Sequence, residues 1–365
     1  MTLPLSQPFR ESALVREIAA QIREITTQPW NIMEICGGQT HAILQYGLDQ
    51  LLPEEISLIH GPGCPVCVTS LEAIEQALQI AARSDVIFTS FGDMLRVPGH
   101  RQDLLSARAQ GSDVRVVYSP LDAVRIARQN PDKQVVFFAI GFETTAPNIA
   151  ASILHASRNQ IQNFSILPAN VLVPPAMHAI LGSPENRVQG FLAAGHVCAV
   201  MGYWEYEPIA SQYGIPIVVT GFEPLDLLLG IRLTISQLEA GRHEVENAYT
   251  RVVTHAGNRT AQEMITRVFT PADRLWRGIG PIPASGLDLQ PEFQAFNALS
   301  RFEIQQGSWS EPAQCIAGQV LRGMAKPYDC PAFGAQCTPQ SPLGAPMVSS
   351  EGACAAYYRY HRVKP

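Results

Sequence analysis

Three cysteines near the start of the chain lie in two glycine-rich segments whose residue types suit metal or redox chemistry. Cys36 lies in the sequence MEICGGQTH, and Cys64 and Cys67 lie in HGPGCPVC. Each segment follows an apolar run, at 31–35 and 56–60, which is typical of a buried strand. In an open α/β sheet, ligands bind outside the carboxyl ends of parallel strands, so we expect the three thiols to meet there. Three converging soft ligands indicate a metal or redox site.

The spacing of Cys64 and Cys67 is compatible with more than one use of the pair. A C-x-x-C sequence is a redox dithiol, half of a zinc site, or two unrelated cysteines. The prolines and glycines around this one restrict its backbone. His41 and His60 lie beside the thiols, and each is either a ligand or proton carrier or an ordinary structural histidine.

Acidic residues follow other apolar runs of the chain. Glu143 lies in GFETT, and Asp93 and Glu223 occupy similar places in FGDM and GFEPLD. All three are expected to face the same crevice. Glu143 either accepts a proton or orients a ligand there, or it stabilises the positive end of a helix dipole. The second interpretation is the one we prefer for Glu223.

Three further residues with reactive side chains are interpreted as structural. His178 and His196 lie near turns, where a histidine usually has its hydrogen bonds satisfied. Cys198 lies in the apolar sequence HVCAVMGY and is predicted to be a small core residue.

Four more cysteines form the second candidate site, at the end of the chain. Cys315, Cys330, Cys337 and Cys354 have the spacing C-x14-C-x6-C-x16-C. Four thiolates are what a [4Fe–4S] cluster or an all-cysteine zinc site requires. Structural zinc usually takes closely spaced pairs, and these cysteines are scattered. The spacing alone therefore leaves open an iron–sulfur cluster, zinc, or no metal.

One acidic residue lies close to the last of these cysteines. Glu351 precedes Cys354 by three residues and is a candidate catalytic residue. Ser349 or Ser350 is expected to cap a helix through 355–359, which would place Cys354 in its first turn.

Strand and helix patterns alternate through the first two thirds of the chain. The predicted strands are 31–35, 56–60, 85–89, 114–118, 134–140, 171–173, 197–201 and 216–220. The predicted helices are 10–27, 70–82, 121–128, 236–254 and 260–269. Such alternation favours parallel sheets built from βαβ units.

Local similarity between VIFTSFGDMLRVPG, VVFFAIGFETTAP and IVVTGFEPLDLL divides this α/β pattern into two similar parallel-sheet domains facing a cleft. The predicted parts are an N-terminal helix in 1–29 that packs on the C-terminal domain, a first α/β domain at 30–130 with Cys36, Cys64 and Cys67, a second α/β domain at 131–230, and a mainly helical or irregular C-terminal domain at 231–365.

Composition excludes several classes of protein. The net charge of −6 gives no basic surface for nucleic acid. No apolar run reaches the length of a membrane span, and the N-terminus lacks the apolar core of a signal peptide. A cytoplasmic location follows as an expectation. Eight cysteines in such a chain of 365 residues are more often metal-binding or catalytic than disulfide-bonded.

Taken together, these motifs resemble the HypD family of hydrogenase maturation proteins. The matching segments are MEICGGQTHAI, HGPGCPVC, FGDMLRVPG, GFETTAP, GFEPLDLL, DCPAFGAQCTP and MVSSEGACAAYYRY. They extend over nearly the whole chain. One departure is Gln39, which stands where many members of the family have histidine.

The resemblance implies a function and a role for each cysteine. It implies work with the small chaperone HypC and the cyanide-delivering enzyme HypE on the Fe(CN)2(CO) unit of [NiFe]-hydrogenases. Cys36 would bind the iron transiently, and Cys64 and Cys67 would be a redox dithiol. The four C-terminal cysteines would hold a [4Fe–4S] cluster. Passage of electrons from this cluster to the dithiol is our hypothesis.

Two other functions fit the same residues. The first is a thiol–disulfide oxidoreductase with a purely structural C-terminal metal. The second is a non-catalytic scaffold that presents iron to partners and needs Cys36 but neither Cys64 nor Cys67.

Overall fold

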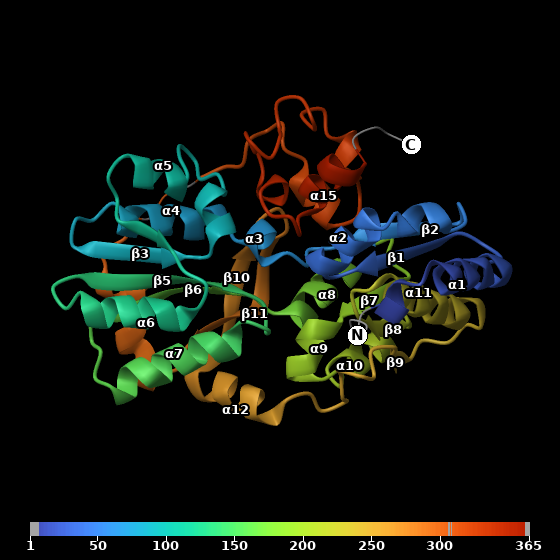
Figure 1. Cartoon of the computed structure of the whole chain (residues 1–365), viewed down its shortest axis with the longest axis horizontal. Coiled ribbons are helices and arrows are strands. Elements are labelled where there is room, and N and C mark those ends of the chain that lie inside the picture. The colour runs from blue at the N-terminus through green and yellow to red at the C-terminus, as the bar shows by residue number, and fades with distance from the viewer. Residues whose placement is uncertain (1–6, 306, 308, 362–365) are drawn as a thin grey trace.

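The computed structural model describes residues 7–361, apart from residues 306 and 308. Two parallel β-sheets form its centre, and an antiparallel hairpin lies between them (Figure 1). The five-stranded sheet has the order β2 (Ile56–His60), β1 (Trp30–Glu34), β7 (Gly190–Ala194), β8 (Ile217–Thr220) and β9 (Val245–Asn247). The four-stranded sheet has the order β4 (Val114–Val116), β3 (Val86–Ser90), β5 (Gln134–Gly141) and β6 (Phe164–Asn170). The hairpin is β10 (Phe269–Trp276) and β11 (Gly280–Leu289).

Helices cover both faces of each sheet, as parallel sheets require. Those that pack on the five-stranded sheet are α1 (Ser12–Ile25), α2 (Gly37–Gln45), α8 (Val173–Leu181), α9 (Gly195–Met201), α10 (Tyr206–Tyr213) and α11 (Pro224–Glu239). Those that pack on the four-stranded sheet are α4 (Leu71–Ala81), α5 (Leu104–Ala109), α6 (Pro120–Gln129) and α7 (Ala146–Arg158).

Shorter helices connect and follow the two sheets. The α-helices are α3 (Pro65–Val68), α12 (Arg259–Val268), α13 (Ala298–Arg301), α14 (Ala317–Leu321) and α15 (Ala353–Tyr360). The 3-10 helices are η1 (Gln7–Arg10), η2 (Leu48–Leu51), η3 (Gly92–Arg96), η4 (Pro291–Phe296), η5 (Pro327–Asp329) and η6 (Ala345–Met347).

Strand β5 shows how the sequence produces a sheet buried on both sides. Every residue after Gln134 in this strand is buried. Val135 and Phe137 pack with α6 and α7, whereas Val136 and Phe138 pack with α4. Successive side chains of a strand point to opposite faces, so a continuous apolar run serves two cores at once.

The prediction of two parallel-sheet α/β domains is confirmed, but the predicted boundaries at 130 and 230 are wrong. Strands β1 and β2 pair with β7, β8 and β9, while the intervening strands form the other sheet. Boundary 130 separates β4 from β5, although both lie in one sheet. Boundary 230 cuts α11. Each βα unit has a similar local pattern, and that pattern does not encode which distant strand it pairs with.

The chain passes from one sheet to the other and back, so the first three cysteines do not belong to one domain. Cys36 directly follows β1 and belongs to the core of the five-stranded sheet. Cys64 and Cys67 lie where the chain passes to the other sheet, and they pack in its core. The single predicted domain at 30–130 with all three cysteines is therefore wrong, and the thiols lie at the junction of two domains.

The N-terminal helix also packs differently from its prediction. Val15 and Ile22 of α1 lie in one apolar cluster with Ile231 and Ile235 of α11, over the five-stranded sheet. Ile231 and Ile235 fall within the predicted C-terminal domain at 231–365, but α11 packs on the five-stranded sheet, so the described part of 1–29 packs on a sheet domain. Residues 1–6 lie outside the described residues. Apolar residues at helical spacing show that a helix needs a partner, and do not identify it.

Two predicted strands are wrong. The run predicted as 197–201 lies in α9, and 171–173 leads into α8 after β6 has ended. A short apolar run fits a buried helix as well as a strand. Strand β7, which is the actual neighbour of β1 in the sheet, was missed because its sequence GFLAA is poor in residues that favour strands.

The C-terminal segment is largely irregular and lies over both domains. The proline-rich stretch around 271–291 forms the hairpin, which contacts β6 and α8. Beyond it, α15 packs on α2, and η6 packs on α3 (Figure 1). Helix α15 begins after Gly352 without a side-chain cap, so capping by Ser349 or Ser350 is wrong. Within the part of the chain that the structure describes, no helix is both long and apolar enough to cross a membrane.

Candidate metal and redox sites

Cys36 lies where two glycine-rich turns touch. It is the residue before α2, with extended backbone, and only 2% of it is exposed. The Gly37 amide donates a hydrogen bond of 3.0 Å to the Gly63 carbonyl, which joins the two turns. A Cβ atom at Gly63 would lie 2.2 Å from the backbone nitrogen of Cys36. The approach of the second turn to Cys36 therefore requires glycine at 63.

The surroundings of Cys36 keep its thiol protonated. Burial raises its pKa to about 12, and hydrogen bonds from backbone amides, chiefly that of Gln39, only partly oppose this. Its Sγ lies 3.7 Å from Nδ1 of His196, whose pKa burial lowers to about 4. A neutral imidazole and a neutral thiol thus face each other. A soft metal ion that displaced the thiol proton would find one sulfur and one nitrogen donor here.

His196 was missed as a site residue by the sequence analysis. It lies at the start of α9, directly after β7, which is the neighbour of β1. Its place at the same sheet edge as Cys36 follows only from the pairing of β1 with β7. The prediction that His178 is a satisfied polar residue agrees with the structure, because its Nδ1 lies 3.2 Å from the Tyr213 hydroxyl.

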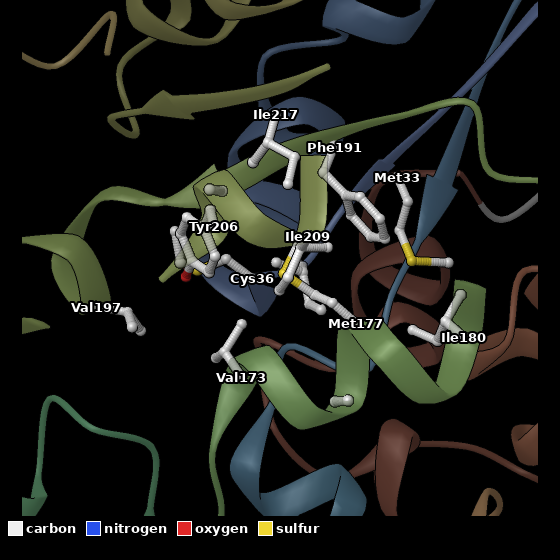
Figure 2. Close-up of a cluster of buried hydrophobic side chains, with 14 of the residues drawn as sticks. Met33, Cys36, Val173, Met177, Ile180, Phe191, Val197, Tyr206, Ile209 and Ile217 are labelled. Atoms are coloured by element: carbon white, nitrogen blue, oxygen red, sulfur yellow. The ribbon is translucent and has the colours of Figure 1, made fainter. Parts of the chain in front are cut away.

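Two further buried polar side chains, Cys198 and Tyr206, lie near Cys36. Figure 2 shows Cys36 and Tyr206 within an apolar cluster that includes Met177. Burial raises the pKa of Cys198 and of Tyr206, which hydrogen-bond to each other. Cys198 is wholly buried, in agreement with its prediction as a core residue.

Glu143 belongs to the same buried region. Its Oε1 accepts a hydrogen bond of 2.8 Å from the Val173 amide at the start of α8, while its Oε2 has no partner among the described residues. Burial raises its pKa to about 7. Glu143 thus accepts a hydrogen bond at the start of a helix and has a second carboxyl oxygen that is able to hold a proton.

Cys64 and Cys67 are joined by a disulfide, with their Cα atoms 5.2 Å apart. Pro65 begins α3, and the Cys67 amide donates to the Cys64 sulfur at 3.2 Å. Only 3% and 1% of the two cysteines are exposed. A dithiol reagent in bulk solvent therefore has little access to either sulfur.

A cavity of about 270 Å³ lies between this disulfide and the C-terminal segment. Its lining includes Cys67 and Cys315. Arg277 also lines it and forms an ion pair with Glu311, at 2.7 Å. One residue of the disulfide and one of the C-terminal cysteines thus line the same space.

The C-terminal cysteines lie in one region of the structure. Cys330, Cys337 and Cys354 pack in one small apolar cluster. Burial, and then the proximity of the other three thiols, raises the pKa of Cys354. The Leu343 amide donates to the Cys337 sulfur at 3.3 Å. Such N–H···S bonds are typical around iron–sulfur clusters.

The four C-terminal thiols match a four-thiolate site in number and in ligand type. Among the described residues, no group of three or more His, Cys, Asp or Glu side chains lies close enough together to hold a metal ion. The four thiols nevertheless lie within electrostatic range of one another, and their chemistry suits either a [4Fe–4S] cluster or zinc.

The remaining predicted residues lie around these sites. Nδ1 of His41 lies 2.9 Å from the Ser350 carbonyl oxygen, so this histidine faces the C-terminal segment. Glu351 is exposed, but its backbone lies against Gly37, where a Cβ would be 2.4 Å from the Glu351 oxygen. His60 is buried between Glu34 and Tyr357.

Other polar residues have structural roles. Gln39 is buried and donates to the carbonyls of Ala193 and Thr220 at 3.1 and 3.3 Å, which ties α2 to the ends of β7 and β8. Glu223 caps α11, as preferred from the sequence, and pairs with Arg10. Asp93 lines a cavity with His41, and no cysteine is among the described residues that line that cavity.

Comparison with known proteins identifies a family. Residues 12–361 match the model of the family described as "HypD: Hydrogenase formation hypA family". The chain is 48% identical over 363 residues to the hydrogenase expression/formation protein HupD of Azotobacter chroococcum. This alignment covers 97% of this chain and 96% of that protein. It is 47% identical over 349 residues to the hydrogenase maturation factor HypD of Escherichia coli, covering 95% of this chain and 94% of that protein.

Similarity to solved structures adds nothing to this. A conserved domain protein from Vibrio cholerae aligns with 11% identity and a TM-score of 0.14, covering 75% of this chain and 99% of that chain. The family match over nearly the full length, and the identity to these relatives, show that the chain belongs to the HypD family of hydrogenase maturation factors.

Proposed function

We propose that the protein is both scaffold and redox partner in assembling the Fe(CN)2(CO) unit of [NiFe]-hydrogenases. The iron is the cargo, held transiently at Cys36, with the neutral His196 as hydrogen-bond partner or nitrogen ligand. The observation that carries this is the position of Cys36, which is buried at the junction of two domains and in contact with the turn that leads to the disulfide. An iron carrying cyanide and carbonyl needs a soft ligand and protection from water and oxygen.

The buried disulfide supports a redox role with a dedicated donor. Reduction of the Cys64–Cys67 bond takes up two electrons and two protons and yields two thiols. Cyanide carried as thiocyanate on a partner requires reductive release, so two thiols are a suitable source of electrons. Because neither sulfur is exposed to bulk solvent, turnover on generic disulfides is disfavoured, which argues against a general oxidoreductase.

The four C-terminal cysteines are the proposed ligands of a [4Fe–4S] cluster. When bound, such a cluster supplies single electrons. Cys315 lines the same cavity as Cys67, and this supports electron transfer from the proposed cluster to the disulfide. The small chaperone HypC and the cyanide-delivering enzyme HypE are the proposed partners, and the cytoplasm is the proposed location.

Infrared spectroscopy tests the proposal. Protein purified anaerobically with HypC should show cyanide and carbonyl stretches, and Cys36→Ser should lose them while its iron–sulfur absorbance stays unchanged. Retention of these bands in Cys36→Ser would refute the assignment of Cys36. If Cys64→Ser kept both the bands and hydrogenase maturation, the non-catalytic scaffold would be the better description.

A further inference from the structure

A buried histidine and a buried glutamate form a pair at the ends of β1 and β2. Glu34 and His60 are direct partners in the register of the two strands. Only 0% and 4% of them are exposed, and Nδ1 of His60 hydrogen-bonds to Oε1 of Glu34. The Thr40 hydroxyl donates to the same oxygen at 2.9 Å. An Nδ1 that donates to a carboxylate leaves Nε2 of His60 as an acceptor.

That acceptor is used by the C-terminal segment. Nε2 of His60 lies 2.9 Å from the hydroxyl of Tyr357 on α15, so the tyrosine donates to it. The two rings are edge to face, with centroids 5.1 Å apart. The hydrogen-bonded chain therefore runs from the Cys36 strand to a helix almost three hundred residues away in sequence.

A second pair repeats this arrangement beside the first. On α2, Nδ1 of His41 donates to the Ser350 carbonyl at 2.9 Å, and its Nε2 lies 3.3 Å from the hydroxyl of Tyr360. The His41 and Tyr360 rings are also edge to face, at 5.4 Å. Two histidines, one on α2 just after Cys36 and one at the end of β2, thus bind two tyrosines of one helix.

These tyrosines share a helix face with a proposed cluster ligand. Cys354, Tyr357 and Tyr360 are spaced by three residues along α15, so they follow one side of the helix. The apolar contact between α2 and α15 is small, with Leu44, Ala356 and Tyr357 as its buried members. The two polar pairs add to this apolar contact in fixing α15 beside the Cys36 turn.

We propose that His60 and His41 are positioning residues that hold the cluster helix in register with Cys36 and keep this thiol buried. The inference rests on the proposed function, because it takes Cys36 as the iron-binding thiol and α15 as the helix that carries a cluster ligand. Opening of the α2–α15 contact uncovers Gly37, against which the Glu351 backbone lies, and so gives solvent access to the preceding Cys36. Cys36 is therefore protected from solvent only while α15 keeps its position on α2.

Alkylation of Cys36 measures this opening. Tyr357→Phe keeps the ring and removes the hydroxyl that His60 binds. Loss of a buried hydrogen bond should increase the population of the open contact by roughly tenfold. Anaerobic protein is treated with iodoacetamide, and the modified fraction of the Cys36 peptide is followed by mass spectrometry. We expect the rate at Cys36 to rise about tenfold in the variant.

Two controls separate registry from general loosening. Cys198 is also buried, in the same core, but lies on α9 away from α15, so its rate in the same sample should change less than about twofold. Tyr213→Phe removes a matched hydrogen bond, from the Tyr213 hydroxyl to His178. This variant should leave the Cys36 rate unchanged.

The outcomes decide the inference independently of the proposed function. An unchanged Cys36 rate in Tyr357→Phe, or equal increases at Cys36 and Cys198, would overturn the positioning role. If Tyr357→Phe does not fold, Tyr360→Phe provides the same comparison at the His41 pair. Iron and sulfide analysis of the same wild-type sample tests the cluster assignment separately, because the ratio of alkylation rates is defined with or without a cluster.

Discussion

Buried titratable groups lie close to one another around Cys36, and one of them, Glu143, has a carboxyl oxygen without a hydrogen-bond partner among the described residues. Cys36, Cys198 and Glu143 all have raised pKa values because burial disfavours their charged forms. A core that only needed to be stable would use apolar side chains at these positions, since an unpartnered buried carboxyl oxygen costs free energy. Perturbed pKa values of this kind are found more often at functional sites.

Glu143 should make the stability of the protein depend on pH. Its pKa is about 7 in the folded state against 4.5 in a model compound, so the folded protein binds the proton more tightly. Stability from this group is fully present below pH 4.5 and is lost as pH rises through about 7. Glu143→Gln should remove a decline of up to about 3 kcal/mol across this range.

Urea unfolding from pH 4.5 to 8 measures this decline. The difference in unfolding free energy between the variant and the wild type should grow with pH. Parallel curves for the two proteins would show that the carboxyl of Glu143 does not titrate in this range.

Short strands and the glycine-rich turns after them position the sulfur atoms of Cys36, Cys64 and Cys67. Strands β1 and β2 end beside each other, and each is followed by a glycine-rich turn and a helix. The turns touch because glycine leaves room between them. This contact, rather than the strands themselves, brings Cys36 toward the disulfide.

Gly63→Ala should separate the two turns. The added Cβ would overlap the Cys36 backbone, so we expect a loss of stability of about 1–3 kcal/mol, as for overpacking of a core. Thermal unfolding measures this loss. Gly92→Ala is the matched control, because a Cβ there meets nothing closer than Val116 at 3.7 Å. Equal effects of the two substitutions would show that the Gly63 contact is not tight.

Cys330→Ala should affect the C-terminal segment without affecting the sheets. Loss of one of the four proposed cluster ligands should remove the iron–sulfur absorbance. It should also loosen the segment, because metal binding and local folding are coupled. Limited proteolysis should then cut the C-terminal segment several-fold faster, while cleavage within the sheets is unchanged. Zinc without cluster iron in anaerobic wild-type protein would refute the iron–sulfur assignment.

The sequence predicts these elements well where the local pattern is decisive. The strands at 56–60 and 134–140 and the helix at 70–82 are found within a residue or two of their predicted bounds. The prediction failed for β7, where alanine and glycine replace the usual strand residues. His196 was missed for the same reason, because its position depends on β7.

The whole molecule brings together segments that are far apart in the chain. The disulfide, the Cys36 turn and the C-terminal cysteines come from different parts of the sequence and meet where the two domains join. The motifs predicted that these residues do chemistry. Their arrangement depends on strand pairing across the chain, which no local pattern contains.

The disulfide should cycle only when the protein has an electron source. In protein handled in air, Cys64 and Cys67 should resist alkylation, and after reduction with dithionite both should be labelled on unfolding. Mass spectrometry of the peptide that contains both residues measures this. Full labelling of both thiols before and after reduction would show that the pair is not redox-active.

The crossing of the chain between the sheets has a consequence for the order of folding during synthesis. Strands β3 to β6 are contiguous, so the four-stranded sheet has its partners as soon as residue 170 has emerged from the ribosome. Strands β1 and β2 are made first, but β7 to β9 are completed only at residue 247. Domains generally fold as units once their residues are available. We therefore expect Cys36 to stay exposed on the nascent chain after the four-stranded domain has folded. It becomes buried only when strands β7 to β9 have been made.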